Sequence, residues 1–142
     1  MSDRKIVDLK TAFVLIVDDN PQNTILLSRL LDYVGVGGYE WKSSSWQVFD
    51  RIEMMPSIDL ILLDLHLANE DGYQVLAKIR GEPRLANARV VAVTADINPE
   101  TLEQVKRAGF DGFLGKPINP REFPQQLADI LHGKKVWRTG YL

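Results

Sequence analysis

Five polar residues stand directly after short apolar runs, and their types suit phosphoryl chemistry. Asp18 and Asp19 follow the run at 13–17, Asp64 follows 60–63, Thr94 follows 90–93, and Lys116 lies just past 112–114. If these runs are strands of one parallel sheet, the residues that follow them meet at its carboxyl edge, where open α/β sheets bind ligands. The sequence therefore predicts one site containing three carboxylates, a hydroxyl and an ammonium group.

Three clustered carboxylates need an opposite charge beside them. At an effective dielectric near ~20, two such charges about 4 Å apart repel by roughly 4 kcal/mol, so the cluster persists only with a cation or a captured proton. Oxygen ligands suit magnesium, calcium or manganese, and magnesium keeps waters that a phosphate oxygen can replace. Asp64 could then accept a phosphoryl group, with Thr94 and Lys116 contacting the same group.

Each of these residues has an ordinary interpretation when it is taken alone. Asp18 and Asp19 could be turn or capping residues, and Asp64 could simply end a strand. Thr94 could cap a turn, and Lys116 could be a solvated surface lysine. Their joint occurrence behind successive apolar runs favours a single site over these separate explanations.

Composition limits the classes of function. The chain has 142 residues, no cysteine, two histidines and a net charge of −2, which predicts one domain without disulfides or a thiolate zinc site. A balanced charge argues against direct nucleic-acid binding. No apolar run approaches the roughly 18 residues of a membrane span, and the N-terminus lacks a signal-peptide core. We expect a soluble, cytoplasmic protein that contacts neither nucleic acid nor membrane.

The pattern between the apolar runs predicts the elements that position the site. Further strands are expected at 39–42, as an edge, and at 112–114. Helices are expected after Asn20, after Ser44 or Ser45, from Gly72, after Asn98, and from Pro120 with Asn119 as its cap. Strands that alternate with helices predict an α/β fold, a doubly wound five-stranded parallel sheet with five helices.

Four segments resemble the receiver domain of two-component response regulators. They are VLIVDDN at 14–20, LILLD at 60–64 followed by Asp71-Gly72, VTA at 93–95, and GKP at 115–117. The resemblance implies a CheY-like, flavodoxin-like fold over residues 13–132, with an N-terminal extension at 1–12 and a C-terminal tail at 133–142. No further domain follows in this sequence, so we expect a stand-alone receiver.

The resemblance also implies a role for each site residue. Asp64 would accept a phosphoryl group from a sensor histidine kinase or a phosphotransfer protein. Asp19, Asp64 and the backbone carbonyl of His66 would bind Mg²⁺ directly, with Asp18 acting mainly through water. Thr94 would be the switch hydroxyl, Phe113 the switch aromatic, and Lys116 a contact of the phosphate. The peptide before Pro117 would be cis. His66 and Asp96 would tune dephosphorylation, and we expect the His66 side chain to be exposed.

Phosphorylation would change the face formed by the fourth helix, the fifth strand and the fifth helix, through which a downstream protein would bind. The resemblance leaves a homodimer open. The loop at 66–70 lacks the family's usual methionine-proline step, and Ala68 predicts a less rigid loop. The tail reads as a frayed terminus, although Trp137 and Tyr141 leave a docking role open.

Three other functions are alternatives to that of a phosphoacceptor. A phosphorylation-independent adaptor of the same fold would normally have lost an acidic or lysine position, and this sequence has lost none. An aspartate-nucleophile phosphohydrolase would carry a second carboxylate two residues after its nucleophile, where this chain has His66. A flavodoxin-type or dinucleotide-binding domain needs a hydroxyl- or glycine-rich loop after the first strand, and Asp18 and Asp19 would repel a phosphate there. We expect no enzyme activity on an outside substrate.

Overall fold

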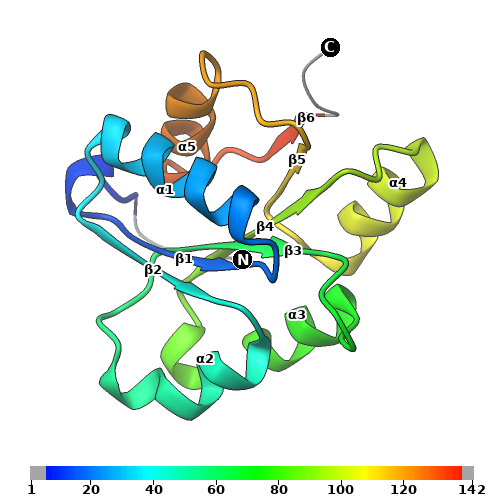
Figure 1. Ribbon diagram of the computed structural model, residues 1–142, viewed down its shortest axis with the longest axis horizontal. Coiled ribbons are helices and arrows are strands. Elements are labelled where there is room, and N and C mark those ends of the chain that lie inside the picture. Colours follow the sequence, from blue (N-terminus) through cyan, green and yellow to red (C-terminus); the bar gives the residue numbers. More distant parts are fainter. Residues whose placement is uncertain (1–5, 139–142) are drawn as a thin grey trace.

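The computed structural model describes residues 6–138, which form a parallel sheet covered by helices on both faces (Figure 1). The strands run in the spatial order β2-β1-β3-β4-β5-β6, and every neighbouring pair is parallel. Their bounds are β1 Phe13–Val17, β2 Gly38–Lys42, β3 Leu60–Asp64, β4 Arg89–Thr94, β5 Gly112–Gly115 and β6 Val136–Arg138. The α/β fold is confirmed, and β2 lies at an edge as predicted.

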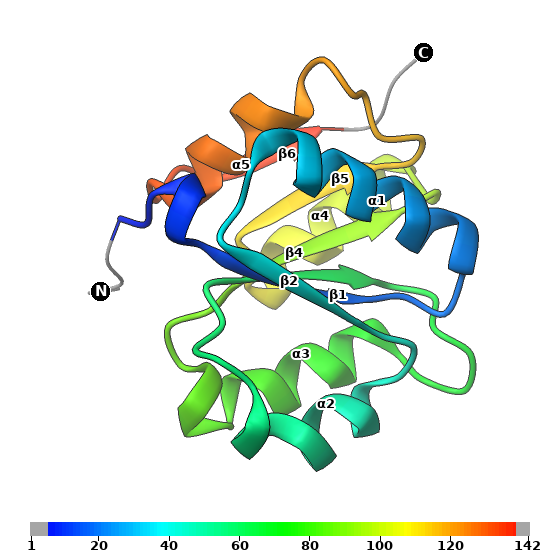
Figure 2. The same cartoon turned by 60° about the vertical axis from the view of Figure 1, so that its left-hand side comes forward.

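Five α-helices connect the strands, as the sequence predicted. They are α1 Pro21–Val34, α2 Ser45–Arg51, α3 Gly72–Arg80, α4 Pro99–Ala108 and α5 Phe123–Leu131. Three short 3-10 turns, η1 Leu9–Thr11, η2 Ile52–Met54 and η3 Pro83–Leu85, accompany them. Figures 1 and 2 show α1 and α5 on one face of the sheet and α2 and α3 on the other, and the buried Val105 places α4 with α2 and α3.

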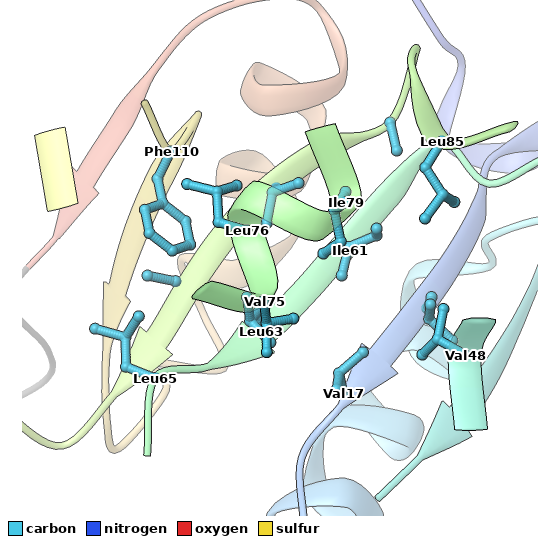
Figure 3. Close-up of a cluster of buried hydrophobic side chains, with 14 of the residues drawn as sticks. Val17, Val48, Ile61, Leu63, Leu65, Val75, Leu76, Ile79, Leu85 and Phe110 are labelled. Carbon is cyan, nitrogen blue, oxygen red and sulfur yellow. The ribbon is translucent and has the colours of Figure 1, made fainter. Parts of the chain in front are cut away.

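Alternate residues of each central strand enter a different apolar cluster. In β1, Leu15 and Val17 pack with the helices α2, α3 and α4, whereas Val14 and Ile16 pack with α1 and α5. Figure 3 shows the first cluster, where Leu76 and Ile79 of α3 lie over the sheet. Burying each such side chain contributes about 1.5–3 kcal/mol, which makes the strand ends a rigid support for the residues that follow them.

Side-chain caps fix where three of the helices begin. The Asn20 side chain accepts hydrogen bonds from two main-chain N–H groups in the first turn of α1, and Asp71 and Asn98 each accept one at the start of α3 and α4. These contacts satisfy N–H groups that have no partner within the helix. The predicted starts of α1, α3 and α4 are therefore confirmed.

The predicted start of the last helix is wrong by three residues. α5 begins at Phe123, and the Asn119 side chain caps only a turn by accepting from the Arg121 N–H at 3.0 Å. A helix that began at Pro120 would need the N–H of residue 124 to bond the carbonyl of residue 120. Residue 124 is a proline and has no N–H, so it fits only the first helical turn.

The C-terminal tail adds a sixth strand to the five that were predicted. Gly133 takes a left-handed φ of 92° after α5, and β6 then pairs with β5. A frayed tail is thus wrong for residues 136–138, while Tyr141 lies outside the described residues. Three residues carry too little periodicity to predict a strand, and an unpaired sheet edge is what recruits them.

Within residues 6–138, no helix combines the length and apolar character needed to cross a membrane.

Candidate functional site

The parallel strands deliver four polar residues to the same end of the sheet. The register pairs Val17 with Leu63, and Thr94 with Gly115, so that β1, β3, β4 and β5 end beside one another. Asp18 and Lys116 are the residues that follow β1 and β5, while Asp64 and Thr94 close β3 and β4. The convergence that the sequence predicted is therefore a consequence of strand register.

Asp18, Asp19 and Asp64 form a compact carboxylate cluster. Each offers one oxygen, and these oxygens all lie within 4.8 Å of one another. Asp18 is 2% exposed and Asp64 is 6% exposed, while Asp19 is half-buried. A cluster of carboxylate oxygens this close together fits a small hard cation such as Mg²⁺.

Lys116 supplies the positive charge of this cluster. Its Nζ lies 3.5 Å from Asp18 Oδ2 and 3.5 Å from Asp64 Oδ2. Its main-chain N–H donates a 2.8 Å hydrogen bond to the Thr94 carbonyl, and the Lys116–Pro117 peptide is cis. The ammonium group thus contacts two carboxylates, while the main chain of the same residue is bonded to the last residue of β4.

Main-chain N–H groups orient all three carboxylates. Asp18 accepts from the Asn20 N–H at 2.8 Å, Asp19 accepts from the Ala68 N–H at 2.6 Å, and Asp64 accepts from the His66 N–H at 3.0 Å. Two of these donors belong to the loop after β3. This loop, for which Ala68 predicted low rigidity, is therefore tied to β1 through Asp19.

Burial changes the acidity of Asp18. Loss of water around this carboxyl raises its pKa above the ordinary value, and the negative charge of Asp64 adds to the rise. The Asn20 N–H and the Lys116 ammonium group offset part of it. An added cation would favour the charged form of Asp18, so that cation binding and proton loss are linked at this position.

The loop after β3 closes where α3 begins. The Gly72 N–H donates to the Leu65 carbonyl at 3.3 Å, and a side chain at position 72 would place its Cβ 2.8 Å from the Leu65 Cα. Only glycine allows this approach. Asn69, with φ of 62°, makes the left-handed bend inside the loop, a conformation that asparagine tolerates better than most residues.

Thr94 and Phe113 are both fully buried. The Thr94 Oγ1 accepts a 3.1 Å hydrogen bond from the Asp96 N–H, which keeps the hydroxyl in the turn after β4. Phe113 pairs with Ala92 in the register of β4 and β5, and with Trp137 in that of β5 and β6. The two residues thus lie on adjacent strands, one at the site and one deeper in the core.

His66 and Asp96 lie at the rim of the site. His66 is exposed, as predicted, and Asp96 is half-buried. Hydrogen bonds from the Thr101 hydroxyl and then from the Asn98 N–H lower the pKa of Asp96, and the charge of His66 lowers it slightly further. The two side chains, in the loops that follow β3 and β4, therefore interact electrostatically.

Two residues of this region were not identified from the sequence. Trp41 Nε1 donates a 2.6 Å hydrogen bond to the main-chain carbonyl of Asp18. Glu70 accepts from the Ser45 N–H at 2.8 Å and also bonds the Ser45 hydroxyl. A tryptophan in an edge strand is a weak signal because its N–H seeks a partner; for Glu70 no local signal exists.

Comparison with known proteins identifies sequence relatives. Residues 14–128 match the response regulator receiver domain family. The chain is 36% identical over 105 residues to the signal transduction histidine-protein kinase BarA of Escherichia coli (strain K12), a match that covers 74% of this chain and 11% of the kinase. The chain thus spans only a small part of that relative's length.

Solved structures share the fold. The chemotaxis response regulator CheY4 of Vibrio cholerae has a TM-score of 0.74 at 22% identity, over 84% of this chain and 98% of that chain. The receiver domain of the sensor histidine kinase PA1611 from Pseudomonas aeruginosa PAO1 has a TM-score of 0.71 at 26% identity, over 87% and 99% of the two chains. That structure has a magnesium ion coordinated in its active site cleft.

Proposed function

The chain belongs to the response regulator receiver domain family, and on this premise we propose that it is a phosphoacceptor whose acceptor residue is Asp64. Receiver domains are signalling domains that interact with histidine kinases or phosphotransfer proteins. In this proposal a phosphohistidine of such a partner is the donor, and the product is an aspartyl phosphate.

The observation that carries the proposal is the placement of Asp64. Its carboxylate closes a buried central strand, lies with Asp18 and Asp19 in one cluster, and has an oxygen 3.5 Å from the Lys116 Nζ. A structural carboxylate at a strand end needs neither two acidic neighbours nor a shared ammonium group. Such a cluster is costly unless a cation neutralises it or one of its carboxylates takes up a proton.

Transfer requires one bond to form and one to break. An Asp64 oxygen attacks the phosphorus atom, the phosphorus–nitrogen bond of the donor breaks, and the histidine ring leaves with its electron pair. Lys116 neutralises charge on the phosphoryl oxygens, and the Thr94 hydroxyl donates a hydrogen bond to one of them. Hydrolysis reverses the state: water attacks the phosphorus, and the Asp64 carboxylate leaves.

The carboxylates of Asp19 and Asp64 and the backbone carbonyl of His66 would hold Mg²⁺ directly in this proposal, with Asp18 acting mainly through water. When bound, the ion neutralises the negative charge that the attacking and transferred oxygens share. The all-oxygen donor set fits this ion, and the magnesium ion in the active site cleft of the PA1611 receiver supports the assignment. His66 and Asp96, at the rim, would tune the rate at which water reaches the phosphoryl group.

The output would pass through Thr94 and Phe113. The Thr94 hydroxyl gives up its hydrogen bond with the Asp96 N–H and moves toward the phosphoryl group. The Phe113 ring then turns into the space that Thr94 has vacated. The surface formed by α4, β5 and α5 then presents a different shape to a downstream protein or to a second copy of the chain. The added charge biases one of two arrangements, which is how such modifications act.

Acetyl phosphate and Mg²⁺ test the acceptor directly. Intact mass should show one added phosphoryl group on the wild-type chain and none on Asp64→Ala, while Asp50→Ala, an exposed position on α2, should label like wild type. Labelling of the Asp64→Ala chain would show that another residue is the acceptor. An unlabelled wild-type chain would instead favour a phosphorylation-independent adaptor of the same fold.

A further inference from the structure

The edge of β5 is occupied by the chain's own C-terminal segment. Val136, Trp137 and Arg138 pair in parallel with Gly112, Phe113 and Leu114, and Figure 1 shows β6 beside β5 at the end of the sheet. A Cβ at position 112 would lie 3.0 Å from the Val136 carbonyl oxygen. The glycine in β5 thus gives β6 the room to lie this close.

The side chains of β6 lie on a surface formed by residues 112–114 of β5 with Lys106 and Glu122 beside it, which we call the seat. Each position of the seat has its own chemistry. Trp137 packs against the apolar cluster that contains Phe113, and the Lys106 Nζ of α4 lies 5.5 Å from its ring centroid, a cation–π contact. Arg138 Nε lies 4.0 Å from Glu122 Oε1 at the start of α5. The seat therefore spans α4, β5 and α5 and selects an aromatic residue followed by a cation.

The hold of β6 on this seat is small. The strand is three residues long, Val136 and Trp137 are only half-buried, and Arg138 is exposed. The Arg138–Glu122 pair joins side chains that are 61% and 47% exposed, and exposed pairs of this kind contribute little. β6 stays in place because the short connection after Gly133 keeps its effective concentration at the seat high.

We propose that the β5 edge, with Lys106 and Glu122 beside it, is a strand-binding surface for an extended partner segment that carries an aromatic residue followed by a basic one, and that β6 is its tethered competitor. The partner adds a strand to the sheet where β6 now lies, and β6 leaves. The main-chain groups of β5 give affinity, and the two side-chain positions give specificity. This proposal depends on the proposed function in one respect only, namely which protein supplies the segment.

Competition has a measurable size. A tethered strand that fills the seat in nine of ten molecules leaves one in ten open, and the apparent affinity of a competing segment falls about tenfold. The seat is also connected to Thr94. Trp137 contacts the cluster that contains Phe113, and Phe113 pairs with Ala92, which lies two residues before Thr94 in β4. Occupancy of the seat and of the site would then influence each other reciprocally.

The test uses the full-length chain and a synthetic peptide of residues 133–142 as the probe. Isotope-labelled wild type, Trp137→Ala and Arg138→Glu are titrated with the peptide, and amide shifts are followed at Gly112–Gly115 and at Lys106. Arg138→Glu opposes Glu122 with a like charge at an exposed position and leaves the core intact. We expect Trp137→Ala to bind the peptide up to about tenfold more tightly than wild type, and Arg138→Glu to bind it more tightly by a smaller factor, with the largest shifts at these amides.

Equal affinity in all three chains, shifts confined to other surfaces, or no shifts up to the solubility limit would each overturn the proposal. Trp46→Ala, an exposed indole on α2, is the matched control and should bind the peptide like wild type. Sedimentation of the wild-type chain distinguishes β6 exchange between two copies, which would contradict intramolecular competition. The assay needs neither Mg²⁺ nor phosphoryl transfer, so its failure leaves the assignment of Asp64 untouched.

Discussion

The indole N–H of Trp41, on the edge strand β2, donates a 2.6 Å hydrogen bond to the main-chain carbonyl of Asp18. The bond joins residues 23 positions apart and crosses from the edge strand to the loop that carries two of the three clustered carboxylates. It fixes the direction of the peptide between Asp18 and Asp19. Trp41 is thus a positioning residue for the acidic pair, although its side chain is 42% exposed.

Replacing Trp41 should weaken cation binding. Trp41→Phe keeps the ring but removes the donor, which costs about 0.5–1.5 kcal/mol of stability. The freer acidic loop should lower the affinity for Mg²⁺ by up to about tenfold, the lower end of what outer-shell partners of metal ligands provide. Calorimetric titration with Mg²⁺ measures this. Trp46→Phe is the control, and equal affinities in the two variants would contradict the positioning role.

Removal of the lysine charge should have opposite effects on cation binding and on phosphorylation. Lys116 Nζ lies 3.5 Å from two carboxylates and therefore competes with a bound cation. Lys116→Ala should bind Mg²⁺ about 3- to 10-fold more tightly, since a like charge leaves the site. Labelling by acetyl phosphate should slow but persist, and the output should be uncoupled from it.

The matched control for this variant is Lys78→Ala, an exposed lysine on α3, which should alter neither measurement. Unchanged or weaker Mg²⁺ binding by Lys116→Ala would show that the ammonium group does not share the cation's position. Titration followed by labelling kinetics on the same protein sample separates the two effects.

The buried Asp18 should impose a pH dependence on the metal-free chain. Its pKa in the folded state lies above the ordinary 3.8, so between these two pKa values the folded chain binds more protons than the unfolded chain. The free energy of unfolding should therefore fall as pH rises through that interval. Asp18→Asn, which does not titrate, should lack this part of the slope.

Urea unfolding over a pH series with a chelator present measures this dependence. Asp50→Asn, at an exposed position, should keep the wild-type slope. Parallel curves for wild type and Asp18→Asn would mean that burial does not govern this carboxyl.

Glu70 should stabilise the start of α2 from a distance. Ser44, the N-cap residue of α2, makes no side-chain capping hydrogen bond, and Glu70 bonds the Ser45 N–H instead at 2.8 Å. Glu70→Ala should lower the free energy of unfolding by about 1–2 kcal/mol, the usual cost of a lost cap. Glu70→Gln keeps one acceptor oxygen and should cost less. Urea unfolding ranks the three chains, and equal losses in both variants would point to the charge rather than to the hydrogen bond.

The sequence by itself determined the order of β1 to β5 and of the five helices, and it predicted which side chains meet where these strands end. The continuous apolar run at 60–63 is buried on both faces of the sheet, and the Asn98 cap acts on an N–H group two residues away. Because parallel strands end at one edge, residues placed directly after them converge without further information. Asp64 and Lys116 were predictable neighbours for this reason.

Tertiary structure alone decided the contacts that join distant segments. Trp41 meets Asp18 across 23 positions and Glu70 meets Ser45 across 25, and both pairs depend on loop shapes that no local pattern encodes. β6 forms because the edge of β5 is available and Gly112 leaves room for it. Local patterns determine an element through its own burial, whereas an edge strand or an interloop hydrogen bond exists only after its partner is in place.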